Sequence, residues 1–349
     1  MPTVSIPDER KLQLNRWVAH ELQCEQESIQ LESIASDAGF RRYFRFQNPS
    51  QWLAVDAPPQ TEDSRQFVAL ARYLAEHNVH TPSIRAADEH EGFLLVEDFG
   101  DELLHRQLKM GNATQLYRQA FKSLLNLQSC PDNPALIPRY DRALLRRELE
   151  IFSEWFVEKL LAYQLDPAEH ELLDQLFSKL ENSALEQPQT LVHRDFHSRN
   201  LIVRHDHSLG VIDFQGALWG GCTYDVVSLL RDCYISWPRE LVTGLALEYR
   251  EAAVNANLLD DAIEEALYLR WFDWLGLQRH IKVLGIFARL NLRDNKSNYL
   301  KDLPLVIHYT LDVAQTYPEL EAFAEWFSAR LLPLAKQQAW YSGYAREEQ

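Results

Sequence analysis

The chain has 349 residues, of which 46% are hydrophobic and 25% charged, so it is long enough and apolar enough to bury the cores of two sizeable lobes. Its formal net charge of −16 argues against a general affinity for nucleic acid phosphates or anionic membranes, which attract basic chains. We therefore expect a small molecule as its partner.

The cysteines bear on the cellular compartment. Cys24, Cys130, Cys222 and Cys233 show no C-x-x-C spacing and no pattern of a disulfide framework, which in a chain of this length fits a reducing environment. The N-terminal stretch MPTVSIPDERKLQ lacks the apolar core of a signal peptide, and no run approaches the roughly 20 apolar residues of a membrane span. We expect a cytoplasmic protein that binds neither nucleic acid nor membrane.

The first hundred residues predict a small β-rich lobe. A helix should begin after Asp8, which can cap it, and a second helix is expected over residues 61–77, where Phe67, Leu70 and Leu74 recur at helical spacing. The strands predicted in this lobe are residues 29–35, 43–46, 52–55, 81–84 and 92–96. We place a domain boundary near residue 100, which gives lobes of residues 1–100 and 101–349.

Helical patterning dominates the second lobe. The predicted helical segments lie within residues 103–127, 142–163, 167–181, 268–290, 304–313 and 317–334. Residues 268–290 predict a long amphipathic helix or helix pair. Its apolar core stripe consists of Trp271, Trp274, Leu277, Ile281, Leu284 and Ile286. Most aromatic residues of this segment are thus explained by packing alone.

Chemically capable side chains concentrate between Leu191 and Val203, in the stretch LVHRDFHSRNLIV. An apolar pair enters a polar loop, an apolar triplet leaves it, and VIDF follows after a turn, so the pattern predicts a loop carried on a hairpin. Asp195 lies five residues before Asn200, and Asn200 lies thirteen residues before Asp213. Phosphoryl transfer from ATP needs such groups: an Asp to accept a hydroxyl proton, and an Asn with an Asp to hold magnesium on the phosphates.

The motif resembles a known family. HRDFHSRN has the form of the protein-kinase catalytic loop HRDxxxxN, and Asp213-Phe214-Gln215 stands where a kinase has D-F-G. With its second histidine, His197, the loop H-x-D-x-H-x-x-N is similar to that of the aminoglycoside phosphotransferase and choline kinase branch. The resemblance implies an α+β, bilobal, protein-kinase-like fold with a small antiparallel β-rich N-lobe and a mainly helical C-lobe. It also implies that Asp195 is catalytic and that Asn200 and Asp213 bind Mg²⁺.

Two other interpretations of this stretch remain open. It could be a hairpin with a satisfied polar turn and no function, although chance rarely places Asp, Asn and Asp at all three offsets between apolar flanks. It could instead belong to a zinc hydrolase, since His193, Asp195 and His197 alternate and could present ligands from one face of a strand. A zinc site needs a distant fourth ligand and leaves Asn200 and Asp213 unexplained.

The same resemblance places ATP on the first lobe. The turn that contains Gly39 and Phe40 would lie over the phosphates. Glu97 and Phe99, in the sequence EDFG, would lie at the hinge, whose backbone groups would bind adenine.

The first lobe departs from the kinase pattern in its cations. Residues 52–55 lack the lysine that pairs with the α- and β-phosphates, and no lysine occurs between Lys11 and Lys109. Another cation must therefore neutralise the triphosphate, and arginine can bind phosphate bidentately. The candidates are Arg41, Arg42 and Arg45. Alternatively, these are solvated charges on an exposed strand.

Residues after the D-F-Q motif supply candidates for the acceptor site. Asp225 resembles the buried aspartate that braces the catalytic loop in this superfamily. Aromatic faces and paired polar groups suit a sugar, which needs stacking and many hydroxyl contacts. The candidates for substrate binding are His197, Arg231, Asp232, Tyr234, Trp237 and Arg279. The alternative is that the aromatic residues only pack a helix end.

Several longer segments resemble one family more closely. SDAGFRRYFRF, LVHRDFHSRNL, TYDVVSLLRDCYISWP and QRHIKVLGIFARL are similar to the bacterial anomeric kinases of N-acetylmuramate and N-acetylglucosamine, and the fold resemblance spans roughly residues 25 to 335. That family phosphorylates the anomeric hydroxyl with ATP, giving the sugar 1-phosphate for cell-wall recycling, and a uridylyltransferase takes the product. Periodicity and spacing alone predict only that the protein is an ATP-dependent small-molecule phosphotransferase. A kinase of aminoglycosides, choline or homoserine, or a non-catalytic nucleotide-binding scaffold, remains an alternative.

Overall fold

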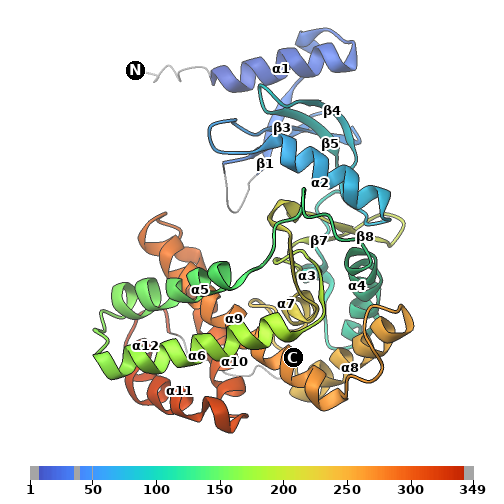
Figure 1. The fold of residues 1–349 in the computed structure, drawn as a ribbon. Helices are drawn as coiled ribbons and strands as arrows, with labels where there is room; N and C mark the ends of the chain where they lie inside the picture. The colour runs from blue at the N-terminus through green and yellow to red at the C-terminus, as the bar shows by residue number, and fades with distance from the viewer. Residues whose placement is uncertain (1–7, 35–39, 49, 342–349) are drawn as a thin grey trace, which may run out of the picture. The chain divides into compact units, whose positions relative to one another are not determined.

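The computed structural model describes residues 8–34, 40–48 and 50–341. The chain forms two compact units (Figure 1). The first consists of Met1–Arg106 and Arg199–Gln215, and the second of Gln107–Ser198 and Gly216–Gln349. The segment 199–215, predicted to belong to the second lobe, is thus part of the first unit. The boundary near residue 100 stays a prediction.

The first unit is built on an antiparallel sheet with the strand order β1-β2-β3-β5-β4. The strands are β1 Leu31–Ile34, β2 Arg42–Phe46, β3 Trp52–Asp56, β4 Ile84–Asp88 and β5 Phe93–Glu97. Four of the five predicted strands are confirmed, whereas the prediction of a strand over residues 81–84 is wrong, because residues 81–83 are not in a strand. The fourth begins at Ile84, where its prediction ends, because Pro82 has no backbone N–H to donate to a sheet.

Two capped helices flank this sheet. Asp8 accepts a hydrogen bond from Lys11 N–H (3.1 Å) at the start of α1, Glu9–Leu22, and Asp63 accepts one from Gln66 N–H (3.0 Å) at the start of α2, Ser64–Glu76. Figure 1 shows α1 and α2 on opposite sides of the sheet. The apolar core between α1 and the sheet consists of Leu14, Val18, Ala19, Ile29, Leu31, Phe44, Ala54, Phe93 and Leu95.

A separate hairpin completes the first unit. Strands β7, Leu201–Val203, and β8, Leu209–Val211, pair with each other in antiparallel register. Val211 N–H donates to the His80 carbonyl (2.8 Å), and Val203 N–H donates to the Glu102 carbonyl (2.7 Å). Gly210 packs directly on the ring of Phe99, where a Cβ atom would lie 2.3 Å from a ring carbon. The hairpin is therefore fixed to its unit by backbone hydrogen bonds and by this close contact.

The loop that carries Asp195 does not lie on that hairpin, and this prediction is wrong. Strand β6, Gln189–Val192, enters the loop but pairs with β9, Leu218–Gly221, whereas β7 leaves the loop and pairs with β8. The loop thus joins two separate two-stranded sheets. An apolar run predicts a strand but not its partner, and β9 lies beyond the next hairpin in the sequence.

The second unit is mainly helical. Its helices are α4 Ala113–Gln128, α5 Arg142–Ile151, α6 Pro167–Glu186, α7 Tyr224–Leu230, α8 Arg239–Asn255, α9 Glu265–Leu292, α10 Leu303–Ala314, α11 Glu321–Trp326 and α12 Leu332–Lys336. The short helix α3, Leu104–Gln107, precedes them. A π-helical segment, Phe152–Leu160, continues α5. Among the described residues, no helix is both long enough and apolar enough to cross a membrane.

Helix α9 is the centre of the second unit's core. It is one helix, the first of the two predicted alternatives, but it is buried on nearly all sides, and polar residues such as Asp273, Gln278 and Lys282 are buried with the apolar ones. The prediction of an amphipathic helix is therefore wrong. Gly285 lets α9 approach the end of α5 closely, because a Cβ atom there would lie 2.5 Å from the backbone of Ile151.

Candidate active site

Asp225 holds the loop that carries Asp195. Asp225 is fully buried, and its carboxylate accepts hydrogen bonds from the backbone N–H groups of His193 (2.6 Å) and Arg194 (3.0 Å). Arg194 has a φ of +77°, a left-handed conformation that costs on the order of 1 kcal/mol or more for a residue with a side chain. The predicted bracing role of Asp225 is thus confirmed, and it fixes the peptide directly before Asp195.

Asp195 is held in its ionised form by its neighbours in the second unit. Surrounding protein desolvates the carboxylate, which by itself raises the pKa. The positive charges of Lys282, His197, Arg279 and Arg194 outweigh this effect, so the pKa of Asp195 lies below its usual value of 3.8. The side chain is nevertheless exposed. Asp195 is therefore an accessible carboxylate that is ready to accept a proton at neutral pH.

Asn200 and Asp213 lie just beyond the open end of the β7–β8 hairpin, in the first unit. The carbonyl of Asn200 accepts a hydrogen bond from Ile212 N–H (3.1 Å), which places Asn200 next to the residue before Asp213. Asp213 is exposed, has a φ of +63°, and accepts a hydrogen bond from Gln215 Nε2 (2.6 Å). The backbone thus places a residue with an amide side chain and a residue with a carboxylate side chain at the same end of one hairpin.

The two histidines of the loop have different surroundings. His193 is fully buried, and its Nδ1 accepts a hydrogen bond from Asp195 N–H (3.3 Å). His197 is half-buried, and its ring meets that of Tyr234 edge-on at 5.5 Å. Among the described residues, no group of three or more His, Cys, Asp or Glu side chains is arranged to hold a metal ion.

The three candidate arginines differ in their partners. Arg42 binds two carboxylates, Asp8 (3.2 Å) and the buried Asp56 (3.0 Å), and ionic partners raise its pKa. Arg45 also binds two, Asp98 and Asp101, each at 2.6 Å, and its pKa is raised in the same way.

Arg41 is the most buried of the three, with 5% of its surface exposed. It binds one carboxylate, Glu62 (2.9 Å), which also accepts a hydrogen bond from Phe40 N–H (3.2 Å). The guanidinium lies 4.5 Å from the centre of the Phe67 ring, and Phe67 stacks on Phe214 at 4.9 Å. A continuous stack therefore links Arg41 to the residue that follows Asp213.

The other predicted ATP-binding residues are placed as follows. Gly39 lies outside the described residues, and Phe40 is two-thirds exposed (66%). The Glu97 carboxylate binds Ser83 Oγ (2.8 Å) and Arg204 (3.0 Å). Phe99 is buried between Gly210 and the guanidinium of Arg204, which lies 4.9 Å from the ring centre. The side chains of Glu97 and Phe99 therefore stabilise the unit itself, and only their backbone groups remain candidates for binding adenine.

Most of the predicted acceptor residues are buried in internal contacts. Arg231 forms a buried ion pair with Asp273 (2.9 Å), and Asp232 accepts hydrogen bonds from Ser198 N–H (3.0 Å) and Tyr234 N–H (2.9 Å). Trp237 donates its indole N–H to the hydroxyl of Tyr117 (2.7 Å). These internal contacts account for the burial of all three side chains without a bound ligand.

Arg279 is also buried, and its guanidinium donates to the Cys233 sulfur (3.3 Å). It nevertheless adds to the positive potential at Asp195. His197 and Tyr234 are the half-buried members of the predicted acceptor set.

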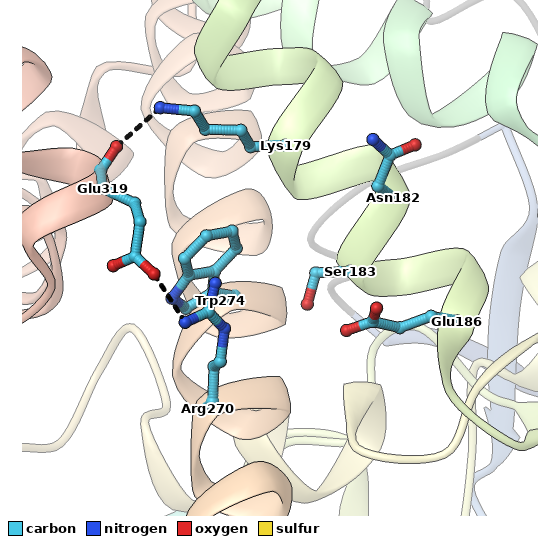
Figure 2. Close-up of a pocket in the computed structure, with 7 residues that line it drawn as sticks. All are labelled: Lys179, Asn182, Ser183, Glu186, Arg270, Trp274 and Glu319. Atoms are coloured by element: carbon cyan, nitrogen blue, oxygen red, sulfur yellow. Dashed lines mark hydrogen bonds and ion pairs between the residues drawn. The ribbon is translucent and has the colours of Figure 1, made fainter.

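A surface pocket of about 240 Å³ lies elsewhere in the second unit, among α6, α9 and residues 318–320. Figure 2 shows that Lys179 donates to the Glu319 carbonyl (2.7 Å) and that the Glu319 carboxylate binds Arg270 (2.8 Å). Its lining residues include none of the predicted site residues. Because several of its polar groups already bind one another, we assign it no role in the reaction.

Comparison with known proteins identifies the family. A model of the phosphotransferase enzyme family matches residues 30–266. The chain belongs to this family. Among solved structures, an ethanolamine kinase from Plasmodium vivax is similar in fold, with a TM-score of 0.64 and 12% identity over 92% of this chain and 93% of that chain. An ADP-bound aminoglycoside phosphotransferase gives a TM-score of 0.59 and 15% identity over 88% of this chain and 99% of that chain. These likenesses confirm the predicted kinase-like α+β fold.

Curated relatives are more similar in sequence than these structures. A protein of Pseudomonas putida is 41% identical over 84% of this chain and 86% of its own length. A protein of Neisseria meningitidis serogroup B is 37% identical over 89% of this chain and 93% of its own length. Both carry the name N-acetylmuramate/N-acetylglucosamine kinase.

Proposed function

We propose that this protein is a kinase that transfers the γ-phosphoryl group of ATP to the anomeric hydroxyl of N-acetylmuramate and N-acetylglucosamine. The observation that carries the proposal is the 41% and 37% identity, over most of the chain, to relatives named for these two sugars. The exposed, ionised Asp195 and the two oxygen donors of the β7–β8 hairpin supply the chemistry.

Asp195 is the proposed proton acceptor. The anomeric oxygen forms a bond to the γ-phosphorus, the bond from that phosphorus to the β,γ-bridging oxygen breaks, and ADP leaves with the electron pair. The hydroxyl proton passes to the Asp195 carboxylate. A reducing-end hydroxyl is more acidic than an ordinary alcohol, so a carboxylate with a low pKa suffices, and positioning supplies most of the rate.

Asn200 and Asp213 are the proposed ligands of Mg²⁺. Amide and carboxylate oxygens are the hard donors that this ion prefers, and both residues stand at one end of the β7–β8 hairpin. When bound, the ion neutralises charge on the phosphates. The protein's own contribution is the exposed Asp213 carboxylate, oriented by Gln215.

Arg41 is the proposed substitute for the missing lysine. Arg42 and Arg45 are each neutralised by two carboxylates, whereas Arg41 is paired with Glu62 alone among the ion pairs of the described residues. This Arg–Glu pair has the composition of a kinase lysine–glutamate pair with arginine in place of lysine. Phe40 and the backbone groups near Glu97 and Phe99 would complete the ATP site.

His197 and Tyr234 are the proposed sugar contacts, since a half-buried aromatic edge suits a sugar ring. The product, a sugar 1-phosphate, would serve cell-wall recycling in the cytoplasm, where a uridylyltransferase would take it.

An acceptor panel tests the proposal. Purified protein with ATP and Mg²⁺ should release ADP in the presence of N-acetylmuramate or N-acetylglucosamine. It should release none with N-acetylglucosaminitol, the reduced sugar that lacks an anomeric hydroxyl but keeps the other hydroxyl groups. Aminoglycosides, choline and homoserine belong to the same panel. Turnover with one of these instead would support the other small-molecule kinases, and ATP binding without any acceptor-dependent ADP would support the scaffold alternative.

A further inference from the structure

We propose that Lys282 of α9 and Glu148 of α5 are positioning residues for Asp195, acting through Arg194. This inference rests on the proposed function, because it concerns the carboxylate that would accept the sugar proton. All four residues lie in the second unit.

A buried ionic cluster contacts the loop that carries Asp195. The Glu148 carboxylate binds Lys282 Nζ (3.1 Å) and also binds the guanidinium of Arg194 and the hydroxyl of Tyr140. Lys282 Nζ donates in addition to the hydroxyl of Tyr224 (3.2 Å). Only 5% of Glu148 and 6% of Lys282 is exposed. Ions buried to this extent cost several kcal/mol each unless they are well paired.

Arg194 is fixed at both its backbone and its side chain. Its N–H donates to Asp225 (3.0 Å), and its guanidinium binds Glu148 and donates to the Gly216 carbonyl (3.3 Å). These contacts hold the left-handed φ of +77° that Arg194 adopts. Since Asp195 is the next residue, a change in Arg194 displaces the proposed catalytic carboxylate.

The charges within this cluster do not cancel. Glu148 carries one negative charge, while Lys282 and Arg194 carry two positive charges, so one positive charge is left over. Burial acts to raise the pKa of Glu148, but the two cations lower it, so this carboxylate stays ionised. Asp195 supplies the balancing negative charge, and Lys282 is the cation that favours its ionised form most.

Other charged groups act on Asp195 as well. His197 in the loop and Arg279 on α9 lower its pKa, as Arg194 does. Asp225 interacts with Asp195 as a like charge. A test must therefore separate the effect of Lys282 from that of these neighbours.

The experiment compares Lys282→Met, which keeps the length of the side chain but removes its charge, with Lys282→Arg, which keeps the charge. The carboxyl group of Asp195 is titrated by ¹³C NMR in the full-length protein, and its signal is identified by its loss in Asp195→Asn. We expect Lys282→Met to raise the pKa of Asp195 and to lower kcat about 10- to 100-fold with little change in either KM. The Lys282→Arg variant should restore both values towards those of the wild type.

A double variant, Lys282→Met with Glu148→Gln, removes one charge of each sign and keeps the test readable if the single variant folds poorly. It should also show a raised Asp195 pKa, because Lys282 is gone. An unchanged Asp195 pKa in both variants would overturn the inference. The titration does not depend on turnover, so it can be interpreted even if the wild type phosphorylates neither sugar. A wild type that phosphorylates neither sugar would reject the proposed function but not this inference.

Discussion

Asp195 shows how one side chain depends on its neighbours. Burial alone would raise its pKa, but four nearby cationic side chains reverse the direction. Its pKa lies below 3.8, so the carboxylate is deprotonated at every pH above that value, and no loss of activity between pH 5 and 7 should come from its protonation.

The first prediction concerns removal of this carboxylate. Asp195→Asn should lower kcat by about 10²- to 10⁴-fold, the usual contribution of a positioned general base. Its thermal unfolding should stay close to that of the wild type, because the Asp195 side chain is exposed. The matched control is Asp206→Asn, on an exposed aspartate in the turn of the β7–β8 hairpin, which should keep wild-type kcat. Substantial activity in Asp195→Asn would contradict the role of the residue.

The second prediction concerns Asp225 and pH. Burial raises the pKa of this carboxyl group to about 7, from 3.8 in an exposed carboxyl. Between these values the folded protein holds a proton that the unfolded chain has lost, so the stability contributed by Asp225 falls as the pH rises from about 4 to about 7 and then stays level. The free energy of unfolding in urea, measured for wild type and Asp225→Asn over this range, should show a pH-dependent difference. A constant difference would show that Asp225 is ionised in the folded protein.

The third prediction distinguishes Arg41 from Arg42. Arg41→Ala should raise the KM for ATP about tenfold or more, since a hydrogen bond to a charged group contributes about 1.5–3 kcal/mol. Arg42→Ala should leave the KM for ATP near the wild-type value, because its partners are Asp8 and Asp56. A larger rise in the KM for ATP in Arg42→Ala than in Arg41→Ala would assign the phosphate-binding role to Arg42 instead.

Sequence reasoning identifies residue types at this scale but not their partners. The loop motif predicts Asp195, Asn200 and Asp213 by spacing alone. It cannot show that Arg231 pairs with Asp273, or that Asp232 caps the backbone of Ser198, because these partners are distant in the sequence. Glu148 was not predicted at all, since a single glutamate in a predicted helix has no distinguishing signal.

At the level of helices and strands, local patterns predict most elements of the fold. The capping residue Asp8 predicts the start of α1, helical spacing predicts α2, and apolar runs predict four of the five strands of the sheet. Strand pairing is not local, which explains why β6 was not matched with β9. The burial of α9 could not be predicted from its sequence for a similar reason. A buried central helix can contain charged residues if they pair with residues of neighbouring helices, as Lys282 pairs with Glu148.

The fourth prediction concerns the packing of α9. Gly285→Ala should destabilise the protein by more than 1 kcal/mol, because its Cβ atom would lie 2.5 Å from the backbone of Ile151, which cannot move aside cheaply. Gly244→Ala is the matched control: it lies on the exposed side of α8 with nothing within 4 Å of a Cβ atom, so it should stabilise the protein by about 0.5–1 kcal/mol. Thermal unfolding of both variants measures the difference. Equal melting temperatures would contradict the close contact.

The residues proposed to bind the nucleotide and the residue proposed to accept the proton belong to different units of the molecule. Asp195 belongs to the second unit, whereas Asn200, Asp213 and Arg41 belong to the first, and the division falls between Ser198 and Arg199. Nucleotide binding should therefore depend mainly on first-unit residues, and proton acceptance on the second. The fold class could be predicted from the motif and its resemblance, but the assignment of the β7–β8 hairpin to the first unit could not.

The fifth prediction follows from this division. ATP with Mg²⁺ should raise the melting temperature of the wild type more than ATP with EDTA, since a ligand that binds only the folded state stabilises it by about 2.7 kcal/mol at 100 times its Kd. In Asp213→Asn this dependence on Mg²⁺ should disappear, whereas Asp195→Asn should retain it. A full Mg²⁺-dependent rise in Asp213→Asn would reject Asp213 as the metal ligand.

The most direct measurement of the central claim is to locate the phosphate on the product. The protein is incubated with ATP, Mg²⁺ and N-acetylglucosamine labelled with ¹³C at C1, and the product is observed by ³¹P NMR. We predict a phosphate signal that is split by coupling to the labelled carbon, which shows that the phosphate is attached to the anomeric oxygen. An unsplit signal, which places the phosphate on another hydroxyl group, or the absence of any sugar phosphate, would contradict the account.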